Sequence, residues 1–275
     1  MSDGRRNIVW IASYPKSGNT WVRFLLCNLL YGQQESAASL NRLAPDIHEV
    51  GPQITRYPGG LLKTHFAFSA SLPCAERTAT AIYVVRDPAD VIASNYHYAR
   101  RSGATSEDSQ AAFDRYFDSF VQQRGEPRWR ELGMGTWEEN VCSWLDGGPP
   151  FPVLCIKYEA LVSDPRQVGR ALARLLRPGS SDEEIGRAVE ASAFARLREV
   201  EEADIRHKRV GIFYKPYLQG SIDAGNRFMR HGTAGDGSRR LSTAQRSQLR
   251  AAFPALLMRL GYAAEPLTRA QSAMR

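Results

Sequence analysis

The 275-residue sequence lacks long apolar runs and contains only four cysteines. None of its apolar stretches approaches the ~20 residues that span a bilayer, and the run 8–12 is too short for an export signal. The cysteines, at positions 27, 74, 142 and 155, show no CxxC spacing. We therefore expect a cytoplasmic protein with no membrane span, disulfide framework or metal site. Cys27, Cys142 and Cys155 lie in apolar segments, which predicts core thiols.

A dense block of basic residues is also absent, although the formal net charge is +7. Arginine pairs occur singly, at 5–6, 100–101 and 239–240, which argues against a basic arm for nucleic acid. The charge favours an anionic partner, and a nucleic acid, a membrane surface or a polyphosphorylated nucleotide would each satisfy it.

Apolar strands alternate with amphipathic helices along the chain. The predicted strands are 8–12, 61–65, 81–85 and 152–156. The predicted helices are 21–30, 89–100, 137–145, 165–176, a helical pair around 182–200, and 242–260, while 32–60 reads as mostly loop with one short helix. This order predicts an α/β fold with a central, mostly parallel sheet between helical layers, so ligands should bind at the carboxyl ends of the strands. We expect residues 1–275 to form a single domain, with 102–135 and 202–240 as mobile lid or acceptor-binding segments.

The segment Ser13–Trp21, SYPKSGNTW, joins the first strand to the first helix. Such a junction points backbone N–H groups and the positive end of a helix toward an anion. Lys16 adds a cation, and Gly18 permits close approach of the backbone. The loop is not a Walker A motif, because the lysine precedes the only glycine. An ordinary turn with a surface lysine is the alternative.

The third strand ends in Arg86-Asp87-Pro88, where Asp87 suits a helix N-cap and Pro88 the first helical turn. Arg86 and the hydroxyl of Ser94 on that helix could meet one anion, although Arg86 could equally be a plain ion-pair residue. Further along, Thr136 and Glu139 have the spacing of a capping box.

Six segments, in order, resemble the cytosolic-type sulfotransferases, which use 3′-phosphoadenosine 5′-phosphosulfate (PAPS). YPKSGNTW resembles their YPKSGTTW loop, and Tyr83–His97 resembles their YVxRxxxDVxxSxYH segment. The others are KTH at 63–65, GTWEENVCSWL at 135–145, YEAL at 158–161 and RHG at 230–232. The resemblance implies a P-loop-kinase-like domain that transfers a sulfuryl group from PAPS to a hydroxyl and releases 3′-phosphoadenosine 5′-phosphate (PAP). A faint echo of the family's dimer motif at 239–247 also suggests a homodimer.

The resemblance assigns the nucleotide-binding residues. Those implied to hold the 5′-phosphosulfate are Lys16, Ser17, Gly18, Asn19 and Thr20. Those implied to surround the adenine are Trp21, Tyr158 and Phe194, although Trp21 could equally be a core residue. Those implied to bind the 3′-phosphate are Arg86, Ser94, Arg230, His231 and Gly232. His231 replaces a lysine of the family's RKG motif, and Arg239 or Arg240 could supply the missing charge.

The resemblance also assigns the chemistry. His65, of the KTH segment, is the candidate general base, since an imidazole titrates near neutral pH. His97 is its rival among the five histidines. Lys16 and Lys63 would stabilise charge on the leaving group, and Ser94 would tune Lys16. Transfer would be direct and in line, without a metal.

Two other functions compete with this interpretation. A P-loop kinase would share the sheet, but it requires a GK[ST] step. A non-enzymatic nucleic-acid module would need basic residues interleaved with aromatics, for which residues 227–240 come closest. For the acceptor, the aromatics at 113–120 and at 213, 214 and 217 suggest a flat or apolar phenol or alcohol. The composition resembles bacterial members, including the glycopeptide-antibiotic sulfotransferases, and so favours a secondary metabolite over a carbohydrate or lipid; neither nucleic acid nor membrane is expected as a partner.

Overall fold

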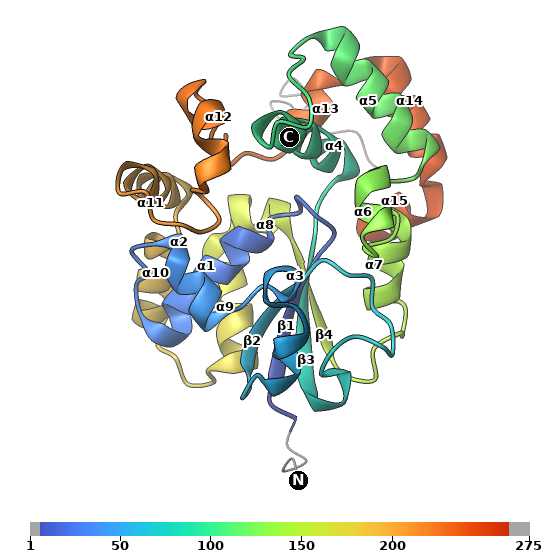
Figure 1. The fold of residues 1–275 in the computed structure, drawn as a ribbon. Helices are drawn as coiled ribbons and strands as arrows, with labels where there is room; N and C mark the ends of the chain where they lie inside the picture. The colour runs from blue at the N-terminus through green and yellow to red at the C-terminus, as the bar shows by residue number, and fades with distance from the viewer. Residues whose placement is uncertain (1–5, 264–275) are drawn as a thin grey trace, which may run out of the picture.

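A computed structural model describes residues 6–263, apart from the side chains of residues 52 and 55. Its sheet has four parallel strands in the order β2-β1-β3-β4. The strands are β1 (Ile8–Ala12), β2 (Gly60–Thr64), β3 (Thr78–Val85) and β4 (Val153–Lys157). Helices lie on both sides of the sheet (Figure 1). The α/β three-layer fold and the parallel sheet predicted from the sequence are confirmed.

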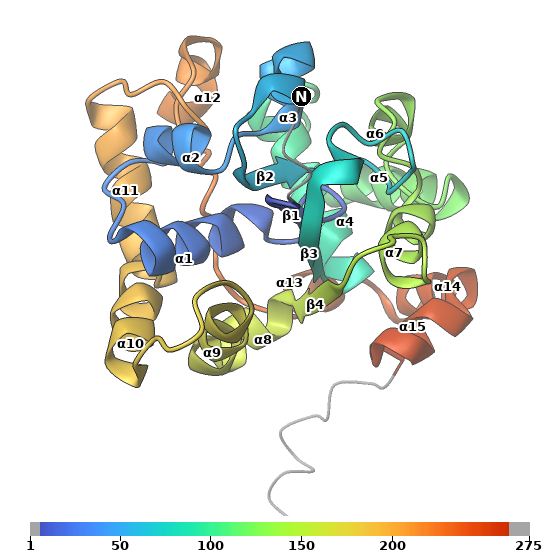
Figure 2. The same ribbon diagram turned by 90° about the horizontal axis from the view of Figure 1, so that it is seen from below.

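The helices fall into two groups, seen most clearly in Figure 2. One group contains α1 (Asn19–Tyr31), α2 (Ala37–Leu43), α9 (Pro165–Leu176), α10 (Asp182–Ala191) and α11 (Phe194–Arg206). The other contains α5 (Gln110–Gln122), α6 (Pro127–Glu131), α7 (Trp137–Leu145), α14 (Thr243–Ala252) and α15 (Pro254–Leu260). Five further helices lie nearer the sheet ends: α3 (Ile47–Val50), α4 (Pro88–Arg101), α8 (Tyr158–Ser163), α12 (Gln219–Asp223) and α13 (Asp236–Arg240). The 3-10 turns are η1 (Gly51–Arg56), η2 (Ala75–Arg77) and η3 (Pro216–Leu218).

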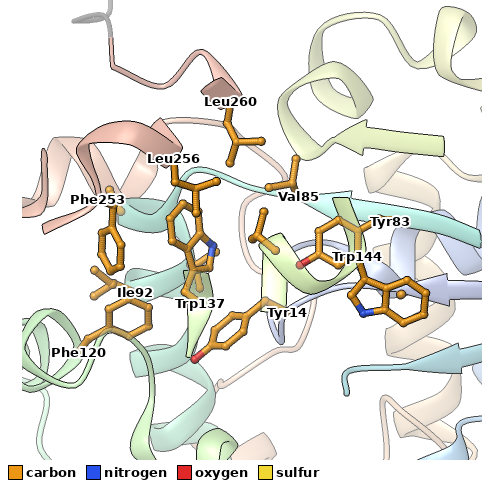
Figure 3. Close-up of a cluster of buried hydrophobic side chains, with 14 of the residues drawn as sticks. Tyr14, Tyr83, Val85, Ile92, Phe120, Trp137, Trp144, Phe253, Leu256 and Leu260 are labelled. Carbon is orange, nitrogen blue, oxygen red and sulfur yellow. The ribbon is translucent and has the colours of Figure 1, made fainter. Parts of the chain in front are cut away.

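Alternate residues of the central strands enter two separate cores. Trp10 and Tyr83 face the core that α7 and α15 cover, whereas Ile11 and Ile82 face the core that α1 and α9 cover. This division follows from the two-residue period of a strand buried on both faces. In the first core, the rings of Trp137 and Phe253 meet edge to face with centroids 5.1 Å apart (Figure 3).

The predicted helix starts agree with the structure. The Asp87 carboxylate accepts the N–H of Ala89 at the start of α4. Thr136 and Glu139 form a complete capping box at the start of α7. Both caps satisfy N–H groups that the first helical turn leaves without partners.

Three expectations about individual segments are wrong. Segment 32–60 contains α2, α3 and η1, where mostly loop with one short helix was expected. The helix predicted at 242–260 is broken into α14 and α15, because Pro254 has no N–H and begins the second helix. Two of the three cysteines expected in the core are not buried there. Cys142 is only partly buried, and Cys155 is exposed because it lies in the edge strand β4. Cys27 is buried as expected.

The segment between α12 and α13 has no regular structure, and two buried carboxylates attach it to the domain. Glu201 of α11 accepts the N–H groups of Phe228 and Met229 at 2.6 and 2.7 Å. Asp90 of α4 accepts those of Gly235, at the end of the segment, and of Gly237 in the first turn of α13, at 2.9 and 2.6 Å. These bonds satisfy backbone donors that would otherwise be buried without partners.

No helix within residues 6–263 has both the length and the apolar character needed to cross a membrane.

Gly237→Ala should destabilise the protein, because a Cβ at this position would lie 2.0 Å from the carbonyl oxygen of Ala89. We expect the free energy of unfolding to fall by about 2 kcal/mol or more. Gly220→Ala in α12 is the matched control, since no other atom lies within 4 Å of its added Cβ, and helix propensity should stabilise it by up to ~1 kcal/mol. Urea unfolding measures both, and equal stabilities for the two variants would contradict the expectation.

Candidate functional site

A cavity of about 290 Å³ opens at the carboxyl ends of the strands. Residues that follow or end all four strands line it, together with residues of α4 and of the segment 228–233. The predicted site residues in its lining are Lys16, Gly18, Asn19, Thr20, Trp21, Lys63, His65, Arg86, Ser94, Tyr158, Phe194, Arg230, His231 and Gly232. Ser17 is buried and does not line it. Positions scattered over more than 200 residues of sequence therefore meet at one place.

The loop after β1 depends on one glycine. Gly18 has φ +102°, and a Cβ there would lie 2.5 Å from the ring of Tyr158. Gly18 is the N-cap residue of α1. Because glycine has no side chain, it makes no capping hydrogen bond to the first N–H groups of the helix. Asn19 acts within the loop, because its amide nitrogen donates to Ile11 O at 3.0 Å and to Ser13 Oγ at 3.2 Å.

Lys16 lies deep in the cavity, with φ +70°. Its Nζ is 4.4 Å from the ring centroid of Phe228 and 4.5 Å from that of Tyr98. Burial, followed by repulsion from Arg101 and Arg86, lowers the pKa of Lys16 to about 7. A cation held in so positive a site should gain from the arrival of an anion.

Arg86 is fixed from several sides. Its Nη2 is 3.3 Å from Asp90 Oδ2, and its guanidinium carbon is 3.8 Å from the ring centroid of Tyr158. Longer hydrogen bonds reach the carbonyls of Lys16 and Thr233. Its Nε is buried without a hydrogen-bond partner in the structure. Arg86 is thus an ion-pair residue, as the alternative predicted, and it also lines the cavity.

Three aromatic side chains form one wall of the cavity. The ring of Trp21 has its centroid 5.8 Å from those of Tyr158 and Phe194. Gly232 lies against Phe194, because a Cβ there would be 2.3 Å from the ring. Trp21 is only 9% exposed, so it belongs both to the core and to this wall.

The basic residues near the C-terminus divide into two groups. Arg230 and His231 line the cavity, and both lie near the carboxylate of Asp236, at 2.6 and 3.1 Å. Arg239 and Arg240 are not in the lining. Arg239 contacts the other oxygen of Asp236 at 3.4 Å and donates to the carbonyl of Ala234, and Arg240 stacks 3.8 Å from the ring centroid of Phe113. That either arginine supplies the charge of the family lysine stays a prediction.

His65 has a defined tautomer. Its Nδ1 lies 2.8 Å from the carbonyl oxygen of Ser13, which can only accept, so Nδ1 carries the proton and Nε2 keeps a free lone pair. Burial, followed by repulsion from Lys63 and His48, holds the pKa of His65 well below its usual value. The ring is therefore neutral near pH 7 and can accept a proton.

His97 is not part of the cavity lining. Its Nε2 donates to the carbonyl of Arg227 at 2.9 Å, which gives this ring a structural role. Of the two rivals for the base, only His65 faces the cavity.

Several lining residues were not predicted from the sequence. They are Arg23, Asp46, His48, Glu49, Tyr98, Arg101, Trp129, Met134 and Lys215. Arg23 and Arg101 are almost fully buried, and each has an Nε without a partner in the structure. No sequence motif marks these residues. One local feature could have indicated Asp46 and His48, because they are an acidic residue and a histidine in the otherwise apolar stretch 45–48.

The family model for the sulfotransferase domain matches residues 6–261 of the chain. The chain belongs to this family. The sulfotransferase is 25% identical to dog sulfotransferase 1B1 over 88% of its own length and 80% of the relative's. It is 26% identical to bovine sulfotransferase 1A1, over 86% and 78% of the two chains.

Solved structures share its fold. Retinol dehydratase in complex with androsterone and PAP superposes with a TM-score of 0.68 at 19% identity, covering 92% of this chain and 81% of that one. Mouse sulfotransferase SULT7A1 with PAP gives a TM-score of 0.67 at 19% identity, covering 93% and 85%. Family membership favours a sulfotransferase over the kinase and the non-enzymatic module.

PAP binding to the sulfotransferase should weaken as pH rises above about 7, near the pKa of Lys16. A bound phosphate would raise that pKa, so the complex holds more protons than the free protein, and affinity falls as the free lysine deprotonates. Calorimetry at pH 6.5, 7.5 and 8.5, in buffers of different ionisation enthalpy, should show proton uptake. An affinity that stays constant across this range would contradict the assignment to Lys16.

Proposed function

We propose that this sulfotransferase moves the sulfuryl group of PAPS to a hydroxyl of a small-molecule acceptor. The observation that carries the proposal is the convergence of Lys16, Arg86 and Arg230 on one cavity that also contains the neutral ring of His65. The PAP complexes of two structural neighbours support the choice of nucleotide.

The residues present suit PAPS at each of its parts. The N-terminus of α1, Thr20 and Lys16 offer donors and charge for the 5′-phosphosulfate. Arg86, together with Ser94 and Arg230, would hold the 3′-phosphate. The wall of Trp21, Tyr158 and Phe194 would receive the adenine.

The proposed reaction is a direct displacement. As the acceptor oxygen attacks sulfur, its proton passes to His65 Nε2, and the bond from sulfur to the bridging phosphate oxygen breaks. PAP departs with that electron pair. Lys16 and Lys63 stabilise the negative charge that develops there, and Ser94 orients Lys16 before the acceptor arrives. No covalent enzyme intermediate and no metal is required by this scheme.

The acceptor is proposed as a phenol or alcohol of a secondary metabolite, in a cytoplasmic, bacterial enzyme.

Most of the aromatic residues that suggested a flat acceptor, at 113–120, 213, 214 and 217, do not line the cavity. Phe113, Phe117 and Phe120 are core residues, and Phe213 and Tyr214 are buried outside the cavity lining. Tyr217 alone of that set lines the cavity.

Both proposed acceptor-binding segments do contribute to the lining. Trp129 and Met134 come from 102–135, and Ile212, Lys215, Tyr217 and Leu218 come from 202–240. That either segment moves stays a prediction, as does a homodimer.

Arg86→Ala should weaken PAP binding by about tenfold to a hundredfold, the usual cost of losing hydrogen bonds to a charged group. Calorimetric titration with PAP, ATP and ADP measures these affinities. We expect Lys16→Ala to weaken PAP binding to a similar extent. The matched control is Arg170→Ala, because Arg170 pairs with Asp182 on the exposed surface of α9 and α10. A wild-type preference for ATP over PAP would reject the proposed donor.

His65→Ala should lower kcat by about 10² to 10⁴, the usual contribution of a general base, while PAP still binds. Formation of labelled PAP from PAPS with 4-nitrophenol as acceptor provides the assay. A variant with wild-type kcat would remove His65 from the mechanism. His97→Ala, at a position outside the cavity lining, should have a smaller effect on kcat than His65→Ala if His65 is the base.

A further inference from the structure

The turn Pro45–His48 lies against the end of β2 and binds it through main chain and side chains. Lys63 N–H donates to the Pro45 carbonyl at 2.8 Å, and Lys63 Nζ donates to Asp46 Oδ2 at 2.7 Å. The other carboxylate oxygen, Oδ1, accepts the N–H of His48 at 3.0 Å and caps α3. Asp46 thus performs two separate tasks with its two oxygens.

His48 acts on the other candidate catalytic residue. Its Nε2 accepts the backbone N–H of His65 at 2.8 Å, and the two rings stack with centroids 5.9 Å apart. On the opposite side, the carbonyl of His65 accepts from Asn140 Nδ2 at 2.9 Å. Side chains from α3 and α7 therefore hold the main chain of His65 from both sides, while Ser13 holds its ring.

We propose that Asp46 and His48 are positioning residues for sulfuryl transfer, Asp46 acting through the Lys63 ammonium and His48 through the main chain of His65. The inference rests on the proposed function, since it needs Lys63 and His65 to act on the reacting groups. A purely structural role for Asp46 would require only the oxygen that caps α3. The second oxygen, directed to a lysine in the cavity lining, is the feature that the structural role leaves unexplained.

Charged and titratable groups face Lys63 from three elements. They are Arg23 of α1; Asp46, His48 and Glu49 at α3; and His65 after β2. Burial lowers the pKa of Lys63 to about 8, and Asp46 is the largest opposing influence. Removing the charge of Asp46 should therefore lower that pKa further, so that the ammonium is lost at a lower pH.

Asp46→Asn separates the two tasks, because asparagine caps helices as well as aspartate does but carries no charge. We expect the alkaline limb of the pH profile of kcat to move to lower pH, with kcat at pH 7.5 down about tenfold. Glu49→Gln is the matched control, since its carboxylate pairs with Lys215 at 2.9 Å, and its limb should move less. An Asp46→Asn profile that superimposes on wild type, or on Glu49→Gln, overturns the inference for Asp46.

His48→Gln and His48→Leu form the second pair. The glutamine carbonyl can reach the place of Nε2 and accept the His65 N–H, whereas leucine fills similar space without an acceptor. We expect kcat to stay within about threefold of wild type for His48→Gln and to fall about tenfold for His48→Leu, with KM for PAPS little changed in both. Equal kcat values for the two variants overturn the inference for His48.

One measurement needs neither variants nor turnover. In ¹⁵N-histidine spectra of the wild-type protein, His48 should be unprotonated at Nε2 and His65 at Nε2, as their hydrogen bonds require. Protonated Nε2 on His48 at neutral pH overturns its role even if a variant fails to fold. Wild-type protein that neither binds PAP nor transfers sulfuryl groups rejects the proposed function itself, and the inference with it. An active wild type with unchanged variants rejects the inference alone.

Discussion

The structure depends on the accommodation of several cations in one cavity, where Arg86 and Arg101 are buried and Lys16 and Arg230 are half-buried. Lys16, Arg86, Arg101 and Arg230 repel one another there, and this repulsion together with burial depresses the pKa of Lys16. Such an arrangement costs stability in the free protein, because charges removed from water need partners. The protein limits that cost by placing Asp90, Glu201 and Asp236 nearby, and an anionic ligand would complete the compensation.

Those carboxylates also determine how the cavity is closed on its C-terminal side. Glu201 accepts two backbone N–H groups near the start of the irregular segment that carries Arg230 to Thr233, and Asp90 accepts those of Gly235, at its end, and of Gly237 in α13. The same acidic residues therefore balance the arginines and attach the loop. Regular secondary structure is unnecessary there, because the buried carboxylates supply the acceptors that a neighbouring strand would supply in a sheet. Electrostatics and loop conformation are coupled at this site.

The elements and residues that were predicted correctly from the sequence are each determined by residues close to them in the chain. Buried strands, the caps at Asp87 and Thr136, and the loop around Lys16 each depend on neighbouring residues, so short windows of sequence were sufficient. Asp46, His48 and Arg101 could not be found this way, since their partners lie on other elements. The phenylalanines of α5 were misassigned to the acceptor, because an apolar stripe on a helix looks the same whether it covers a core or a ligand. The break at Pro254 was missed because the apolar spacing continues across it.

The burial of Phe113, Phe117 and Phe120 has a consequence for how this enzyme could change over evolutionary time. Under the proposed function, an acceptor would meet other residues, among them the lining positions Trp129, Met134, Ile212, Lys215 and Tyr217. Surface positions such as Tyr217, which is 73% exposed, can be substituted at little cost to stability. If the proposed function is right, acceptor preference could change through a few such positions while the loop at Gly18, which packs against Tyr158, stays constant.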